Sequence, residues 1–121
     1  MMELMIVIVI VAILVSLAYP SYSQYVRKSR RGEAQQLLMN WSINQEIWRS
    51  NHSQYAGVGD LPFPNNDNYK FEFSVLPTAT EYTLQATALY DQLNDKARDG
   101  TPCSPLTLDQ SGVKLIAGCW D

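Results

Sequence analysis

The side chains that most often carry out catalysis are few in this 121-residue chain, and their arrangement does not suit catalysis. His52 is the only histidine, and it lies in a polar stretch, Asn-His-Ser, where we expect it to be exposed to solvent. The sequence contains no motif that pairs a nucleophile with a base, and no glycine-rich phosphate loop. We therefore predict that the protein is not an enzyme and that it uses no cofactor.

Two groups of polar residues have side chains of the type that bind metal ions. Asp91, Asp95 and Asp99 are spaced by four in YDQLNDKARDG, and residues 65–68 read NNDN. The ligands of a Ca²⁺ loop alternate along the chain, whereas basic residues interleave with the acids here. We expect residues 91–99 to form a solvated loop and residues 65–68 to form a turn, so we expect no metal site.

The two cysteines, Cys103 and Cys119, both lie near the C-terminus and flank a turn-rich stretch. An even number of cysteines in this arrangement favours a disulfide and an oxidising compartment. Two unpaired, buried thiols are the alternative. A disulfide that closes a loop of this length contributes roughly 3 kcal/mol to stability in the chain-entropy model.

The formal net charge is -3, but it is unevenly distributed. Residues 1–35 carry four bases and two acids, whereas residues 36–121 carry five bases and ten acids. Such an acidic part is poorly suited to general nucleic-acid binding. The four early bases form one cluster, which we expect to flank a membrane and to meet lipid headgroups or acids of neighbouring subunits; DNA contact is the alternative. They are Arg27, Lys28, Arg30 and Arg31.

A nearly continuous apolar run precedes this cluster. It extends from Leu4 to Tyr19 with Ser16 as its only polar interruption, and Glu3 stands at its head. A cleavable signal peptide needs basic residues before the run, and the remaining chain is too small to bury a helix that is apolar on every face. We therefore predict a membrane helix that can also pack against copies of itself. An ionisable residue in such a helix is a candidate functional residue.

Beyond the run, the apolar positions predict that the helix continues to about Ser50. Pro20 should kink this helix without ending it, and Gly32 marks a bend or a close approach. The apolar positions recur at spacings of three and four, which is typical of an amphipathic helix. They are Tyr22, Tyr25, Val26, Ala34, Leu37, Leu38, Trp41, Ile47 and Trp48.

Alternating apolar residues then predict a small antiparallel sheet. Residues 55–68 contain several glycine and proline breakers and read as a loop. Strands are expected at 69–76, 81–89, 106–109 and 113–117, joined as two hairpins. In the first strand Tyr69, Phe71, Phe73 and Val75 should share one face, and Tyr82, Leu84, Ala86 and Ala88 should do so in the second. The fold class is therefore α+β, with one long helix across a small sheet.

Several stretches of the chain resemble type IV pilins. ELMIVIVIVAIL followed by AYPSYSQYVRKSRRGEAQ resembles the N-terminus of that family. The tail CSPLTLDQSGVKLIAGCW, together with SQYAGVGDLPF and TATEYTLQATA, is similar to PilE-type minor pilins. The resemblance implies the type IV pilin fold, whose long N-terminal helix has a protruding apolar half, and a disulfide-bonded C-terminal hairpin. By this comparison residues 1–20 are the transmembrane or filament-core half of the helix, residues 21–53 its amphipathic half, and residues 54–121 the head.

The resemblance also implies a function. It predicts a non-enzymatic minor pilin that contributes to pilus assembly and to pilus-linked adhesion or twitching motility. Expected partners are other pilin subunits, inner-membrane lipid before assembly and the assembly machinery. The expected location is the inner membrane of a Gram-negative bacterium, with a periplasmic head, and afterwards the extracellular pilus. Glu3 matches the family's glutamate, which pairs with the N-terminal amine of a neighbouring subunit, and Pro20 is a second assembly residue.

Three alternatives remain open within the wider family. They are a major pilin, a type II secretion pseudopilin and a DNA-uptake receptor, the last being disfavoured by the acidic head. The family is made with a basic leader that ends in Gly and is cut before a Phe, which a Thr follows. The leader and these first two mature residues have no counterpart in this sequence, and Met1 and Met2 occupy the two apolar positions just before the family's glutamate. We therefore expect the natural start to lie upstream, and we expect a chain that begins at Met1 to be neither processed nor methylated.

Overall fold

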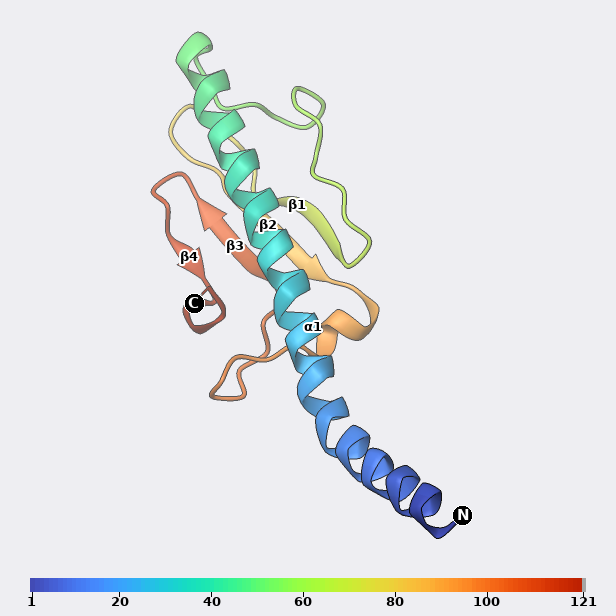
Figure 1. The fold of residues 1–121 in the computed structure, drawn as a ribbon. Helices are drawn as coiled ribbons and strands as arrows, with labels where there is room; N and C mark the ends of the chain where they lie inside the picture. The colour runs from blue at the N-terminus through green and yellow to red at the C-terminus, as the bar shows by residue number, and fades with distance from the viewer. Residues whose placement is uncertain (121) are drawn as a thin grey trace.

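One long helix crosses the face of a small antiparallel sheet and continues well beyond it in the computed structural model (Figure 1). The structure describes residues 1–120, apart from the side chains of residues 18–21. The predicted α+β class is confirmed. The elements in chain order are α1 (Met2–Asn51), β1 (Tyr69–Val75), β2 (Thr83–Ala88), the short 3-10 helix η1 (Tyr90–Asn94), β3 (Leu106–Asp109), β4 (Lys114–Leu115) and the 3-10 helix η2 (Ala117–Cys119).

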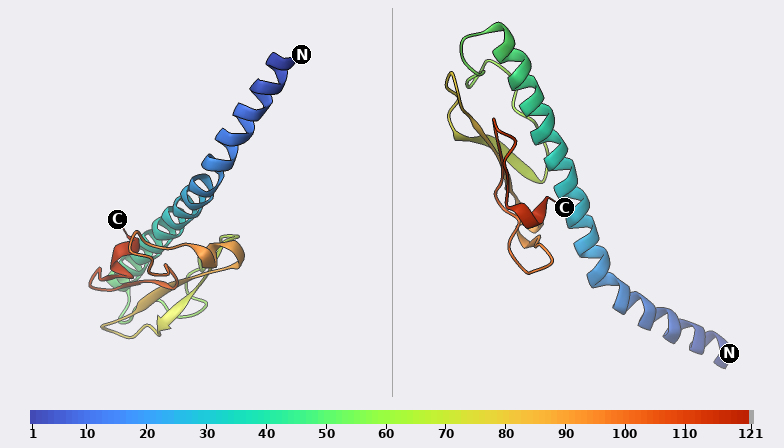
Figure 2. Two further views of the ribbon diagram at one scale, coloured as in Figure 1. Left: turned by 90° about the horizontal axis from the view of Figure 1, so that it is seen from below. Right: turned by 90° about the vertical axis from the view of Figure 1, so that its left-hand side faces the viewer.

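The sheet has the order β1-β2-β3-β4, and every neighbouring pair is antiparallel. Helix α1 lies across one face of this sheet (Figure 2). The predicted disulfide is confirmed: Cys103, which precedes β3, is bonded to Cys119 in η2. The bond closes the C-terminal region into one unit, since its two ends lie on either side of the β3–β4 hairpin.

The core lies between α1 and the sheet. Ala34, Leu38 and Trp41 contribute the buried face of the helix, and their exposed fractions are 0–2%. The alternation expected between Tyr82 and Ala88 is confirmed because all four apolar residues in that stretch are buried. The indole of Trp41 also contacts the rings of Phe63 and Phe73, each with its centroid 5.0 Å away.

The inner face of α1 is shorter than its apolar pattern predicted. Tyr22, Tyr25 and Ile47 were expected to face the sheet, yet their exposed fractions are 65%, 70% and 59%. The inner position near the end of the helix belongs instead to Gln45, which is fully buried. Its amide accepts a hydrogen bond from the N–H of Ala56 (2.8 Å) and donates one to the carbonyl of the same residue (2.9 Å). A polar side chain is therefore tolerated there because it pairs with the loop backbone.

The strands are also shorter than predicted. The β1–β2 register shifts between Phe73 and Val75, so Val75 points to solvent with 41% exposure instead of joining the inner face. β2 begins at Thr83 because the N–H of Tyr82 donates to the side chain of Gln110. β4 has only two residues before the chain turns into η2. The expected close approach at Gly32 is wrong as well, since a side chain there would meet no atom within 4 Å.

The first part of α1 extends away from the head. We call Met2–Leu17 the stalk; each of its residues is exposed. Within the described part of the chain, no single helix is long and apolar enough to cross a membrane. Met2–Leu17 and Tyr22–Asn51, which are bent by 41° relative to each other, have the length and composition of a membrane-spanning segment only when they are taken together. The side chain of Pro20, the predicted kink residue, lies outside the described residues.

Candidate assembly interface

The stalk presents apolar side chains on every face. Their exposed fractions range from 51% at Ile10 to 77% at Met2, because none of the other elements that the structure describes packs against this part of α1. Glu3 lies in the first helical turn. Among the described residues it makes no side-chain hydrogen bond or ion pair. An exposed apolar surface of this extent is typical of a site that binds other proteins or a membrane.

Four polar residues on one stripe of α1, beyond the end of the stalk, bind the helix to the head in addition to the apolar core. Gln24, Arg27, Arg31 and Gln35 are spaced by three or four residues, which places them on the same side of a helix. We call these residues, together with their partners on the head, the polar seam. At its ends, Gln24 donates to the carbonyl of Lys96 (3.1 Å) and Gln35 donates to the carbonyl of Cys119 (2.6 Å). The seam therefore joins the helix to the segments on both sides of the disulfide.

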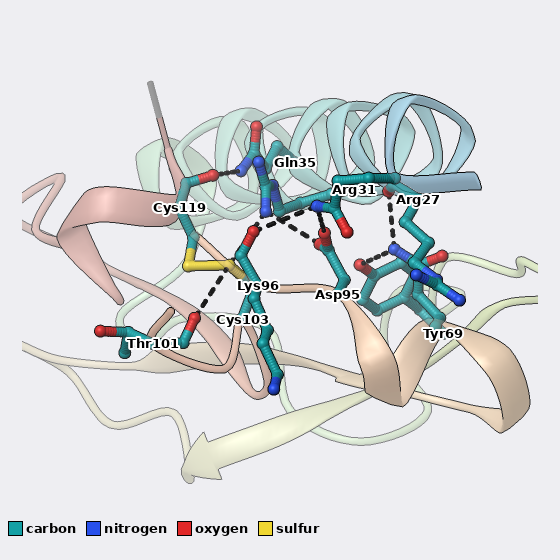
Figure 3. A network of polar contacts seen from close by, with 11 residues as sticks. Arg27, Arg31, Gln35, Tyr69, Asp95, Lys96, Thr101, Cys103 and Cys119 are labelled. Carbon is teal, nitrogen blue, oxygen red and sulfur yellow. Dashed lines mark hydrogen bonds and ion pairs between the residues drawn. A yellow bond between two sulfur atoms is a disulfide. The ribbon is translucent and has the colours of Figure 1, made fainter. Parts of the chain in front are cut away.

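The centre of the polar seam is a buried ion pair (Figure 3). Arg31 Nη1 lies 2.9 Å from Asp95 Oδ2, and the two side chains are 6% and 0% exposed. The same nitrogen lies 2.9 Å from Cys103 Sγ, while Gln24 donates to the other oxygen of Asp95 at 3.0 Å. Charges are stable in such a site only when they are paired and hydrogen-bonded. Arg31 thus links α1 both to the disulfide and to Asp95, the residue that follows η1.

A second, more exposed ion pair lies one helical turn nearer the stalk. Asp91 accepts two hydrogen bonds from Arg27, at 3.0 and 3.2 Å, and Arg30 lies 3.8 Å away. The hydrogen bond from Arg27 lowers the pKa of Asp91 below its ordinary value. Beneath it, the buried Gln92 donates to the carbonyl of Arg27 (2.7 Å) and to the hydroxyl of Tyr69 (2.9 Å). Together these contacts hold η1 against α1.

The structure corrects two of the sequence predictions about charge. Arg31 is not part of an exposed cluster, because it is buried against Asp95. Residues 91–99 are not a wholly solvated loop, since Asp95 is only 1% exposed. Of the predicted cluster, Arg27 and Arg30 contact Asp91, and Lys28 is exposed. The physical reason is complementarity: two acids four residues apart meet bases that are four residues apart on the helix.

Sequence reasoning missed the glutamines that position these charges. Gln24, Gln35 and Gln45 occupy the side of α1 that faces the head, where the pattern predicted apolar residues. A detectable signal was present, because polar side chains with both donor and acceptor groups recur at helical spacing along α1. The prediction for His52 is confirmed: it is exposed, and its ring stacks on Trp48 with centroids 3.9 Å apart. Among residues 1–120, no group of three or more His, Cys, Asp or Glu side chains could hold a metal ion.

The long helix, the four-stranded sheet and the C-terminal disulfide define a type IV pilin. A solved structure described as a high-resolution structure of a type IV pilin from Shewanella oneidensis superimposes on the chain with a TM-score of 0.60 at 26% sequence identity. The match covers 78% of this chain and 98% of that structure. Type IV pilins are membrane-anchored, pilus-associated proteins of the bacterial surface that assemble with other pilin subunits.

A family model assigns the chain more narrowly. The model described as "Type IV minor pilin ComP, DNA uptake sequence receptor" matches residues 20–107, which is most of the chain. The protein therefore belongs to this family of type IV minor pilins, and the resemblance seen in the sequence is confirmed. A search of curated proteins found no match.

Proposed function

We propose that this protein is a non-enzymatic subunit that enters a type IV pilus by inserting its stalk among the helices of other pilin subunits. The uncovered stalk is the observation that supports this most directly. At about 25 cal/mol per Å² of apolar surface removed from water, a stalk left in water would be costly, so it needs the helices of other subunits to cover it outside a membrane. The same surface suits lipid, so the stalk would occupy the inner membrane before assembly, with the head in the periplasm.

Glu3 is the residue that would fix the axial position of each subunit relative to its neighbours. A carboxylate at the end of an apolar helix is costly to remove from water unless it finds a cationic partner. None of the described residues supplies one within the chain. A neighbouring subunit's N-terminal amine is a partner of the right charge at the right end of the helix. Pro20, just beyond the stalk, is the second residue that we assign to assembly, since proline frees a backbone carbonyl and allows a kink.

The test is incorporation of the processed protein into pili in cells that lack the wild-type copy. Glu3→Ala should lower the amount recovered in sheared pili while the membrane-bound amount stays the same. Glu33→Ala is the matched control, because Glu33 is an exposed acid on the same helix beside the head. Equal recovery of the two variants in pili would contradict a pairing role for Glu3. Adhesion or twitching motility should follow the amount of assembled pilus.

A second candidate function is DNA reception, which the description of the matching family favours. The acidic composition of the head argues against broad binding, since the chain has twelve acids and nine bases. Lys114, whose ammonium lies 5.6 Å from the ring centroid of Trp120, is an exposed base beside an aromatic ring that could meet a nucleic acid. The family match favours these minor-pilin roles over a major pilin or a secretion pseudopilin.

Duplex binding by the detergent-solubilised full chain tests this second candidate. A receptor should prefer an uptake sequence over a scrambled duplex, and its affinity should fall linearly on a log scale with salt, since phosphate contacts release counterions. Lys114→Gln should weaken binding to both duplexes, whereas Glu33→Ala should leave it unchanged. Absence of measurable binding at low salt would exclude DNA reception and leave the assembly role intact.

A further inference from the structure

Positive charge is concentrated at the end of the head nearest the stalk. Residues 27–31 and 90–100 together carry six bases and three acids, a formal charge of +3. The rest of the chain carries three bases and nine acids, a formal charge of -6. The two oppositely charged parts of the molecule therefore differ by nine charges, and the positive part contains both ion pairs of the polar seam.

Exposed aromatic and apolar side chains occupy the same end. Tyr22 and Tyr25 on α1 are 65% and 70% exposed, and Tyr90 and Leu93 on η1 are 82% and 58% exposed. Tyr90 also has a φ of 54°, in the left-handed region that a residue with a bulky side chain rarely adopts. Strain retained at a position whose side chain faces solvent is a reason to look for a function outside the head.

Hydrogen bonds place these residues at one level along α1. Gln24 reaches the carbonyl of Lys96 at 3.1 Å, and Arg27 reaches Asp91 at 3.0 Å. The segment from η1 to residue 100 is therefore level with residues 24–27 of the helix, about 10–15 Å beyond Leu17 at 1.5 Å per helical residue. Figures 1 and 2 show this segment, in orange, as the part of the head that lies nearest the stalk.

We propose that this end of the head, which we call the collar, docks on the surface of an anionic lipid bilayer while the stalk is in the membrane. The collar consists of residues 22–31 and 90–100. The proposal rests on the proposed insertion of the stalk into lipid. Tyrosine prefers the headgroup region of a bilayer, bases are attracted to anionic lipids, and a headgroup layer begins where an apolar stalk ends. Docking would set the depth and tilt of the helix before assembly.

The collar also accounts for the early basic cluster. A plain count of bases beside an apolar helix would place the head in the cytoplasm, which disagrees with the disulfide. In the structure, Arg31 is neutralised by Asp95, and Arg27 and Arg30 share Asp91. The remaining positive charge is carried by exposed side chains at the level where lipid headgroups would lie. The bases thus have roles that do not require a cytoplasmic head.

The experiment uses the oxidised full chain in vesicles of phosphatidylcholine with or without phosphatidylglycerol. Leu93→Cys supplies a single free thiol for an environment-sensitive fluorophore, because both native cysteines are bonded to each other. Val58→Cys is the matched control, since Val58 is 71% exposed in the loop beyond the far end of α1. Flotation of the vesicles measures insertion of the stalk, and quenching by a headgroup-attached nitroxide measures docking of the collar.

The expected result is that both labelled proteins float, that the label at 93 is quenched, and that the label at 58 is not. Quenching at 93 should be stronger with phosphatidylglycerol. Each base near an anionic surface contributes about a fivefold factor, so replacing Lys28, Lys96 and Arg98 together by glutamine should lower the docking constant by about a hundredfold. Lys114→Gln, which changes an exposed base of β4, should leave the quenching unchanged.

The other outcomes each overturn a distinct statement. Flotation with equal, weak quenching at both positions overturns the docking of the collar and leaves membrane insertion standing. A change in the fluorescence of the label at 93 that appears only as the protein-to-lipid ratio rises also overturns the docking of the collar on lipid. In that case the collar is covered by a neighbouring subunit. Failure to float overturns the proposed insertion itself and the docking with it.

Discussion

The buried pair of Arg31 and Asp95 allows a sharp test of the polar seam. Asp95→Asn keeps the size of the side chain and removes its negative charge. Arg31 would then be a buried cation, 6% exposed, without its anionic partner. Loss of one member of a buried ion pair costs about 3–5 kcal/mol because the remaining charge stays desolvated.

That loss is large for a domain of this size. Small domains are stable by about 5–15 kcal/mol, so the substitution should remove a substantial share of the free energy of unfolding. For about 100 residues a loss near 4 kcal/mol corresponds to a fall in Tm of roughly 20 °C. The matched control is Asp91→Asn, which breaks the neighbouring pair of Arg27 and Asp91, where the Asp91 side chain is 55% exposed. Little change is expected there because solvent screens the pair.

Urea unfolding of the full chain in a non-ionic detergent provides the assay. Intrinsic fluorescence, to which Trp41 contributes from the core at 2% exposure together with the two other tryptophans, reports unfolding. Near-ultraviolet circular dichroism without urea checks that each variant folds. The double variant Arg31→Met, Asp95→Asn should be more stable than Asp95→Asn alone, because it removes the unpaired cation. Equal urea midpoints for Asp95→Asn and Asp91→Asn would refute the argument that burial makes this pair important.

Three further predictions concern the head. Replacing both cysteines by serine should lower the stability by about 3 kcal/mol, and an unchanged Tm in oxidising buffer would contradict a stabilising role for the bond. Burial raises the pKa of Tyr69 and of Tyr82 to about 12. The free energy of unfolding should therefore be unaffected by these groups below pH 10 and should fall as the pH rises from about 10 to 12, because only the unfolded chain ionises in that range. Phenolate absorbance follows the ionisation, and Tyr82→Phe should reduce the fall. Gln45→Ala should cost about 1–3 kcal/mol because it leaves the N–H of Ala56 unpaired, whereas Asn44→Ala, at an exposed helical position, should cost little in the same urea titration.

Much of the fold could be predicted from local patterns. The alternation at Leu84, Ala86 and Ala88 predicted a half-buried strand, and the spacing of Ala34, Leu38 and Trp41 predicted the buried face of the helix. These predictions succeeded because side-chain direction repeats every two residues in a strand and every 3.6 in a helix. The pattern failed at Tyr22 and Tyr25 because none of the described elements lies opposite them. It failed at Val75 because this residue follows a shift in the β1–β2 register.

The candidate site was only partly predictable. Glu3 and the apolar run were visible at once because an acid beside sixteen apolar or small residues needs no structure to be noticed. The polar seam was not visible, since Arg31 and Asp95 are 64 residues apart in the chain. Nothing in the composition separates a buried, paired charge from a solvated one.

Sequence pattern alone predicted the α+β class, the apolar stalk, a disulfide and the approximate location of the helix and strands, and the resemblance to type IV pilins indicated the class of protein. The helix, the strands and the stalk were predictable because they depend on neighbouring residues and on the solvent that each face prefers. Only the tertiary structure showed that Arg31 is buried, that Gln45 completes the core and that the bases gather with Tyr90 at the stalk end of the head. The burial of Arg31 and the gathering of the bases depend on the path of the chain after β2, which brings η1 and Cys103 against α1 and thereby decides which charges lose contact with water. The burial of Gln45 depends on the loop after α1, which brings Ala56 back against the helix.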